Sequence, residues 1–164
     1  MGVLAFLEQT ALSTFIRESS SLLAFPAFLC MHTLGMSLLV GANCVVSIRM
    51  LGVASSIPLQ PLGRLFPFMW AGFILSVISG GALAMAKATT MVLNPILLTK
   101  LVFVVFATVI MWLMEKKVFR SASGFKETEP GNARILAAAE LVLWLAVMVS
   151  GRLIAYSATI LDLQ

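Results

Sequence analysis

Few side chains in this sequence could do chemistry, and one stands apart: His32 is the only histidine. It lies near the middle of an apolar run that extends from about residue 22 to residue 46. An ionisable group inside such a run is costly unless it is paired or used in function. A neutral imidazole can offer a ring nitrogen to a metal, and haem iron is often held in this way. His32 is therefore the candidate metal ligand.

Three further polar side chains fall at a similar depth of other apolar segments. Lys100 lies about a turn and a half into the third segment, and Arg152 and Tyr156 lie four residues apart in the fourth. Residues at this spacing share one face of a helix. No carboxylate is expected at that depth, so the positive charges predict an anionic group beside them. Haem propionates, a quinone head and a lipid phosphate are the candidates, and only haem also uses the imidazole.

Gly35 lies one helical turn from His32 on the same stripe, where a flat macrocycle could lie against the backbone. The sequence thus predicts that a site for haem b or a quinone is formed by His32, Gly35, Lys100, Arg152 and Tyr156. A second axial ligand could be Met111 or Met148, could come from another subunit, or could be absent. Alternatively, His32 is structural and bonds to a carbonyl or hydroxyl group of a neighbouring helix.

Membrane helices must position these side chains, because the composition is that of a membrane protein. Of the 164 residues, 60% are hydrophobic and 11% are charged, and the mean hydropathy is +1.04. A helix of about 20 apolar residues crosses the hydrocarbon core of a bilayer. Four stretches reach this length, at about 21–48, 65–86, 95–114 and 137–160. The predicted fold is an all-α membrane protein, with a four-transmembrane-helix bundle in residues 21–164.

The ends of the elements are marked by short signals. Residues 1–20 are too short and too polar on one side to span, so they predict an amphipathic helix in the membrane interface, with no signal peptide before it. The serines at 19–21 offer an N-cap for the first span. The third span is expected to begin at Asn94-Pro95, since proline is harmless at the first helical position.

Basic residues indicate the orientation of the bundle. The connections after the first and third spans carry seven Lys and Arg residues, against four on the other side. The positive-inside rule then places both connections in the cytoplasm and both termini on the periplasmic side of a bacterial inner membrane. The net charge of +4 is explained by these flanking residues and does not indicate nucleic-acid binding.

Glu140 is the one acidic residue expected well inside a span, about a turn and a half from the cytoplasmic end of the fourth helix. A buried carboxylate needs a partner. Pairing with Arg134 or Lys116 is the favoured interpretation, and a place on a proton path is the alternative.

Small residues form a stripe on the second span, namely Gly72, Ser76 and Ser79, with Gly80 and Gly81 adjacent. Such a stripe allows a neighbouring helix to approach closely, and a cofactor lying against the glycines is the alternative. The stripe and the interfacial helix also suit a non-catalytic accessory or anchor subunit of a larger membrane complex. An oligomeric transporter of small anions is a third hypothesis. A homo-oligomer or a partner membrane subunit is expected under these hypotheses.

Several short motifs together resemble a family of bacterial four-helix membrane proteins that is known as a domain of unknown function. They are RES from Arg17, HTLG from His32, RMLG from Arg49, PFMWAG from Pro67, Asn94-Pro95 with Lys100, and GRLIAY from Gly151. The resemblance covers nearly the whole chain and implies the fold without an activity. More loosely, the architecture is similar to haem-binding HemJ-type protoporphyrinogen oxidases and to four-helix copper-resistance and cytochrome-like membrane proteins. The oxidases carry further histidines and a longer basic motif, so their activity is not implied.

Overall fold

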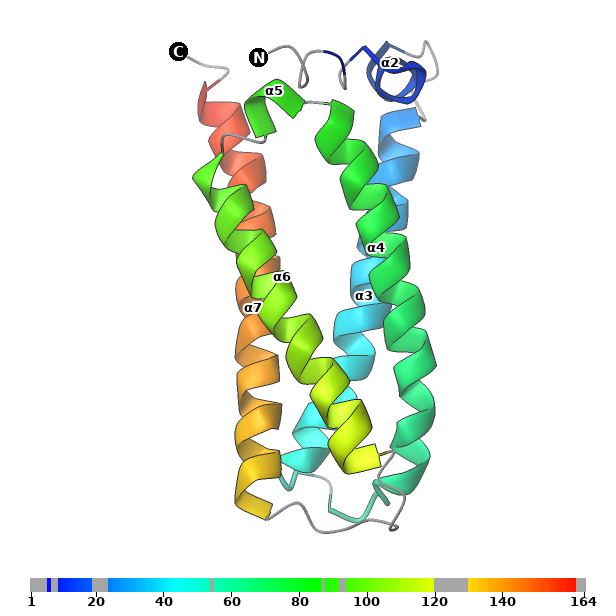
Figure 1. The fold of residues 1–164 in the computed structure, drawn as a ribbon, viewed down its shortest axis with the longest axis vertical. Helices are drawn as coiled ribbons and strands as arrows, with labels where there is room; N and C mark the ends of the chain where they lie inside the picture. The colour runs from blue at the N-terminus through cyan, green and yellow to red at the C-terminus, as the bar shows by residue number, and fades with distance from the viewer. Residues whose placement is uncertain are drawn as a thin grey trace.

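Long helices dominate the computed structural model, which describes residues 6, 9–18, 24–53, 55–86, 88–91, 94–119 and 130–161. The four long helices are α3 (Ala24–Met50), α4 (Phe66–Ala86), α6 (Pro95–Met114) and α7 (Pro130–Leu161). They run alternately up and down, with α2 (Ala11–Glu18) and the short α5 (Ala88–Met91) at one end of the bundle (Figure 1). The predicted four-helix bundle is confirmed.

The outer surface of the bundle is apolar along its length. By length and composition, the helices that could cross a membrane are Phe25–Met50, Gln60–Ala86, Pro95–Met114 and Asn132–Ile154. Large apolar side chains on them face outward, such as Leu34 at 66% exposed, Val105 at 61% and Val142 at 65%. Contiguous apolar surface of this kind marks contact with lipid or with other proteins. The architecture therefore suits a multi-pass membrane protein.

The first residues of the helices can be compared with the predicted boundaries. The third helix begins at Pro95 as predicted, and the side chain of Asn94 caps it by accepting a hydrogen bond from the backbone N–H of Ile96 at 2.9 Å. The fourth helix is expected to begin near Arg134, ahead of the apolar stretch at 137–160, and it begins four residues earlier, at Pro130, because the helix continues into polar sequence. The N-cap expected at residues 19–21 lies outside the described residues.

Gly52 and Arg49 shape the turn that follows α3. Gly52 has a φ of +97°, a conformation that glycine adopts without steric cost, and its N–H donates to the carbonyl of Arg49 at 3.1 Å. The guanidinium of Arg49 donates to the carbonyl oxygens of Ser55, at 3.0 Å, and Ile57. The short helix η1 (Gln60–Leu65) then leads into α4.

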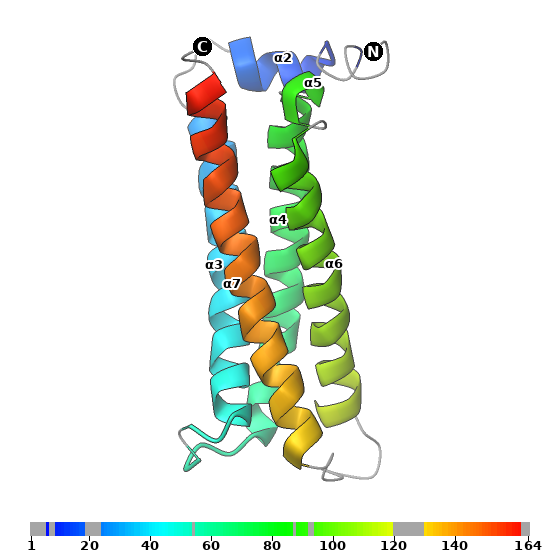
Figure 2. The same cartoon turned by 90° about the vertical axis from the view of Figure 1, so that its left-hand side faces the viewer.

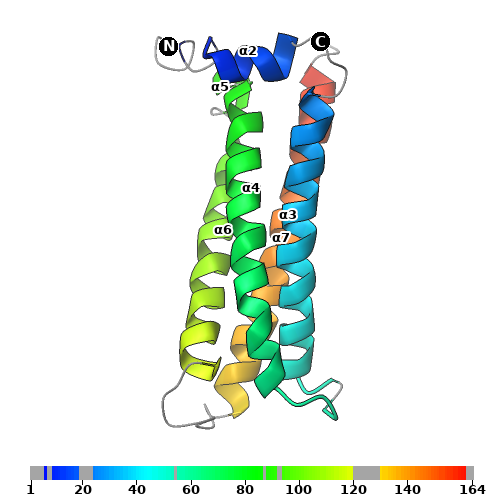
Figure 3. The ribbon, with the colours of Figure 1, turned by 90° about the vertical axis from the view of Figure 1, so that its right-hand side faces the viewer.

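Helix α2 lies across the end of the bundle (Figures 2 and 3). Ile16 is buried and packs with Ala82 and Ala86 of α4 and with Phe28 of α3, whereas Phe15 is exposed. One face of α2 thus packs on the bundle while the other carries an exposed aromatic ring. This position is compatible with the predicted interfacial helix, of which the structure describes residues 6 and 9–18.

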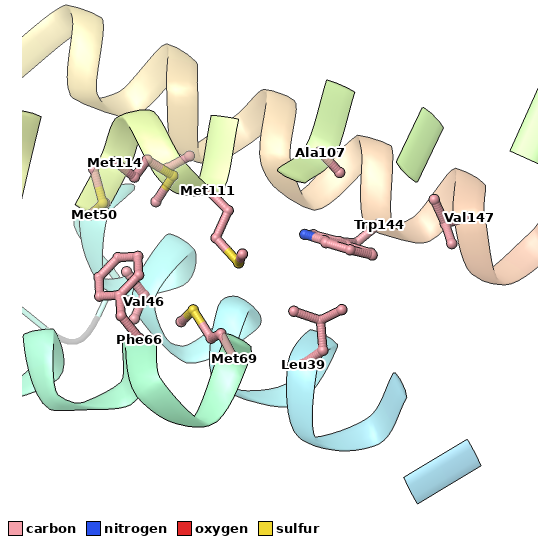
Figure 4. Packing of buried hydrophobic residues seen from close by; sticks show 11 residues of the cluster. Leu39, Val46, Met50, Phe66, Met69, Ala107, Met111, Met114, Trp144 and Val147 are labelled. Atoms are coloured by element: carbon pink, nitrogen blue, oxygen red, sulfur yellow. The ribbon is translucent and has the colours of Figure 1, made fainter. Parts of the chain in front are cut away.

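The apolar core joins the four long helices (Figure 4) and extends from the middle of the bundle toward the end farther from α2. It is built from Leu39, Val46, Met50, Phe66, Met69, Ala107, Met111, Met114, Ala137, Trp144 and Val147. At this end Trp70 of α4 donates its Nε1–H to Glu115 at 2.9 Å, in the short helix η2 (Glu115–Phe119) that follows α6. At the other end α4 and α6 diverge (Figure 1). The bundle therefore consists of two helix pairs, α3–α4 and α6–α7, joined mainly through α3 and α7.

Candidate functional site

His32 is half-buried on the face of α3 that packs against α4. Its Nδ1 is 3.0 Å from the carbonyl oxygen of Ser76 and 3.3 Å from the hydroxyl of Ser79. The carbonyl can only accept, and Ser79 already donates its hydroxyl proton to the carbonyl of Leu75 at 2.6 Å. Nδ1 therefore carries the imidazole proton, and the lone pair lies on Nε2. A hydrogen bond from the other ring nitrogen to a backbone carbonyl is how metal-ligating histidines are commonly oriented.

Gly80 provides the space that the imidazole occupies. A Cβ on residue 80 would lie 2.9 Å from Cε1 and 3.1 Å from Nδ1 of His32. A Cβ on Gly81 would meet nothing within 4 Å. The group that lies against Gly80 of the small-residue stripe is thus the side chain of His32.

Gly35 faces α4 and not open space. A Cβ on it would lie 2.6 Å from the hydroxyl oxygen of Ser76 and 2.9 Å from the carbonyl oxygen of Gly72. In turn, a Cβ on Gly72 would lie 2.7 Å from the carbonyl oxygen of Gly35. Helices α3 and α4 are therefore in backbone contact here, which agrees with the packing interpretation of the stripe. The structure does not support the expectation that a macrocycle lies against Gly35, because α4 covers it.

The predicted cationic cluster divides into two parts. Lys100 is half-buried, and its Nζ lies 3.3 Å from where a Cβ on Gly151 would be. It lies in the same half of the bundle as His32, because His32 is in the first half of α3 and Lys100 is in the first half of α6. The side chains of Arg152 and Tyr156 are exposed on the surface of α7, Tyr156 at 62%. Lys100 thus lies inside the bundle, against α7 and in the same half as His32, whereas Arg152 and Tyr156 lie on the outer surface.

The two methionines considered as second ligands lie in other surroundings. Met111 is 1% exposed in the core of the half farther from α2 (Figure 4), and Met148 is 52% exposed. Among the described residues, no group of three or more His, Cys, Asp or Glu side chains could hold a metal ion. A single imidazole suffices for a metal that brings its own ligands, as haem iron does.

A groove of about 390 Å³ lies between α6 and α7 in the same half as Lys100. Two hydroxyl groups line it, but both are bonded within their own helices. Thr99 donates to the carbonyl of Pro95 at 2.9 Å, and Ser150 donates to that of Val147 at 3.0 Å. The remaining lining is apolar, so the groove suits a hydrocarbon chain better than a polar group.

Glu140 lies at the centre of a buried polar cluster in the other half of the bundle. The residue is 0% exposed, and its Oε1 accepts hydrogen bonds from Asn43 Nδ2 at 2.7 Å and from Trp144 Nε1 at 2.8 Å. Asn43 Oδ1 in turn accepts from the hydroxyl of Ser47 at 3.2 Å. Oε2 of Glu140 is buried and has no hydrogen-bond partner. Sequence reasoning did not find this cluster.

The predicted pairing of Glu140 with Arg134 or Lys116 is wrong. Arg134 is exposed, with Nη2 3.8 Å from where a Cβ on Gly52 would be, and Lys116 places its Nζ 4.8 Å from the centre of the Trp112 ring. The four-residue spacing of Glu140 and Trp144 was a usable signal, because such residues share a helix face. Asn43 is a polar residue inside the apolar first span, but nothing in the sequence linked it to Glu140, which is 97 residues away.

The two polar parts of the bundle are separate. His32 and Asn43 are both on α3, and a rise of about 1.5 Å per residue puts about 16 Å between them along the axis. The first part, with Lys100, lies toward α2, and the second, with Glu140, lies toward the opposite end. Comparison of the chain with protein-family models, with curated proteins and with solved structures gave no match.

Proposed function

We propose that this protein is a small redox component of a membrane that binds haem b in the half of the bundle nearer α2, with His32 as an axial ligand. The observation that carries the proposal is the contact between His32 Nδ1 and the Ser76 carbonyl at 3.0 Å. It orients the ring and leaves the lone pair of Nε2 for a metal. When bound, haem supplies a one-electron change at its iron, and the chain supplies binding, orientation and electrostatics.

Lys100 would give the half of the bundle that contains His32 a positive charge. A lysine ammonium forms charge-assisted hydrogen bonds with carboxylates, which are about twice as strong as those between neutral groups. Lys100 would therefore hold a haem propionate. Arg152 and Tyr156 are exposed near the end of α7, where amphipathic and basic side chains anchor a helix in the interface. We assign them to anchoring and not to the cofactor.

A second ligand for the iron would come from outside the described residues of one chain, or there would be none. The chain has one histidine, and neither Met111 nor Met148 is placed for this role. A second copy of the chain or another membrane subunit would supply the ligand, and without one the iron would be five-coordinate. The excess of basic residues beside two of the connections favours a bacterial inner membrane with both termini in the periplasm.

The test is the absorption spectrum of the detergent-purified protein, oxidised and then reduced with dithionite. The expected result is a Soret band and a reduced α-band that are lost in His32→Ala. Thr33→Ala is the matched control, because Thr33 is the next residue of α3, is exposed and bonds only to the carbonyl of Leu29 at 2.9 Å. Loss of pigment in both variants, or a colourless wild-type protein from haem-replete cells, would contradict the proposal.

A quinone is the second candidate, favoured by the presence of one imidazole and one ammonium group in the same half of the bundle. Two hydrogen-bonding groups on different helices could hold the two oxygens of a quinone ring, and no second axial ligand would then be needed. Organic extraction of the colourless protein and identification of the extracted quinone would support this candidate. An extract without quinone would exclude it for the purified state.

A further inference from the structure

The buried cluster of Asn43, Glu140 and Trp144 has no part in the proposed cofactor site. Glu140 is 0% exposed within one of the candidate spans, and among the described residues no cation contacts its oxygens. A bare carboxylate in such surroundings is strongly disfavoured unless a charge or many donors compensate it. Within the part of the chain that the structure describes, two neutral N–H groups donate to this carboxyl group, and both are directed at Oε1.

The hydrogen bonds of Glu140 are divided unequally between its two carboxyl oxygens, which favours the protonated form. Oε1 accepts twice, as the carbonyl oxygen of a carboxylic acid can, whereas Oε2 has no partner. A carboxylate would carry half of its charge on Oε2, where nothing stabilises it. A hydroxyl at Oε2 carries no charge and leaves one donor without a partner, which costs much less.

The packing also limits which cation could compensate the carboxylate. A metal cation needs several oxygen ligands around it, and the side-chain oxygen of Asn43, which is bonded to Glu140, already accepts a hydrogen bond from Ser47. Oε2 itself is enclosed by packed atoms. A proton needs no coordination shell, so it is the one cation that this site can take without rearrangement.

Charged groups on the neighbouring elements are directed elsewhere. On α3 the guanidinium of Arg49 is bonded to Ser55 and Ile57, and α4 has no charged residue between Phe66 and Ala86. At the end of α6, Glu115 accepts from Trp70, and Lys116 lies over Trp112. On α7 itself, the side chains of Arg134 and Arg152 are exposed.

We propose that Glu140, held by Asn43 and Trp144, is a proton-binding site inside the membrane. In the resting protein the site is a neutral carboxylic acid. Its reaction is the reversible transfer of one proton from Oε2 to water, in which the O–H bond breaks and the electron pair stays on the carboxylate. About 12 Å of helix separates Glu140 from Asn132, where the candidate span begins, so this end is the nearer source of water. The proposal does not depend on a cofactor at His32.

Infrared spectroscopy tests the proposal directly, because a carboxylic acid and a carboxylate absorb at different frequencies. The chain has only seven Asp and Glu residues, so one buried acid can be resolved. We expect a C=O band of a protonated acid at neutral pH that shifts to lower frequency in D₂O. The band should be lost in Glu140→Gln and kept in Glu115→Gln. Glu140→Gln should lower the thermal midpoint only slightly, since glutamine keeps the Oε1 acceptor and adds one buried donor at the position of Oε2.

A second variant covers the case in which Glu140→Gln does not fold. Trp144→Phe removes one donor to Oε1, and weaker hydrogen bonding should move the C=O band to higher frequency. An acid band that is absent at neutral pH, that is the same in wild type and Glu140→Gln, or that Trp144→Phe leaves in place would overturn the proposal. A band that does not move after prolonged exposure to D₂O would also overturn it, because a locked proton is not an exchangeable ligand.

Discussion

The imidazole of His32 occupies the space that a side chain at residue 80 would fill, since a Cβ on Gly80 would lie 2.9 Å from its Cε1. The absence of a side chain at Gly80 is therefore required for the observed position of the His32 ring. With the Ser76 carbonyl holding Nδ1, it determines where Nε2 can lie.

Gly80→Ala should displace the ring and weaken its bond to Ser76. A net loss near that of one hydrogen bond, about 1 kcal/mol, corresponds to a roughly five- to tenfold lower affinity for haem. Haem titration of the purified protein measures the change. Gly81→Ala is the matched control, because a Cβ there meets nothing within 4 Å. Equal effects of the two variants on haem affinity would show that the space at Gly80 does not determine the position of the His32 ring.

Gly72→Ala should destabilise the α3–α4 contact. Its Cβ would lie 2.7 Å from the carbonyl oxygen of Gly35, and backbone cannot move aside as a flexible side chain can. We expect a loss of about 1–3 kcal/mol in the free energy of unfolding, as for other overpacked positions. Denaturant titration in mixed micelles gives the value. Gly41→Ala, where a Cβ meets nothing within 4 Å, should be neutral or slightly stabilising.

Lys100→Gln and Arg152→Gln should separate the two parts of the predicted cationic cluster. Removal of the half-buried ammonium should weaken haem binding by about tenfold or more, the range for a hydrogen bond to a charged group, while the Soret band keeps its position. Removal of the exposed guanidinium in Arg152→Gln should leave the haem affinity and the position of the Soret band unchanged. A loss of haem in Arg152→Gln alone would contradict the assignment of Lys100.

Trp144→Phe should cost more stability than Trp70→Phe, although each removes one indole donor to a glutamate. Trp144 is 2% exposed and donates to a fully buried carboxyl, so about 1–3 kcal/mol should be lost there. Trp70 and Glu115 are only half-buried, and water can replace the missing donor. The two melting curves compare the variants, and a larger loss in Trp70→Phe would be the contrary result.

The helices could be predicted from local sequence signals, whereas the contacts between helices could not. Apolar length and the Asn94-Pro95 start predicted the third helix correctly, because both act within a few residues. The four-residue spacing of Arg152 and Tyr156 predicts that they share one face of a helix. Whether that face is buried or exposed depends on how α7 packs against the other helices, which the spacing does not determine. The partners of Glu140 were missed because charge suggested Arg134, whereas burial selected neutral donors from Asn43 and Trp144.

The most direct measurement of the central claim is rescue of a His32→Gly variant by added imidazole. The truncated site keeps the Ser76 carbonyl that would hold the ring, so free imidazole can take the place of the side chain. We predict a Soret band in the wild type, its loss in the variant, and its return when imidazole is titrated in. A wild-type protein without this band, or a variant that keeps it without imidazole, would contradict His32 as the axial ligand.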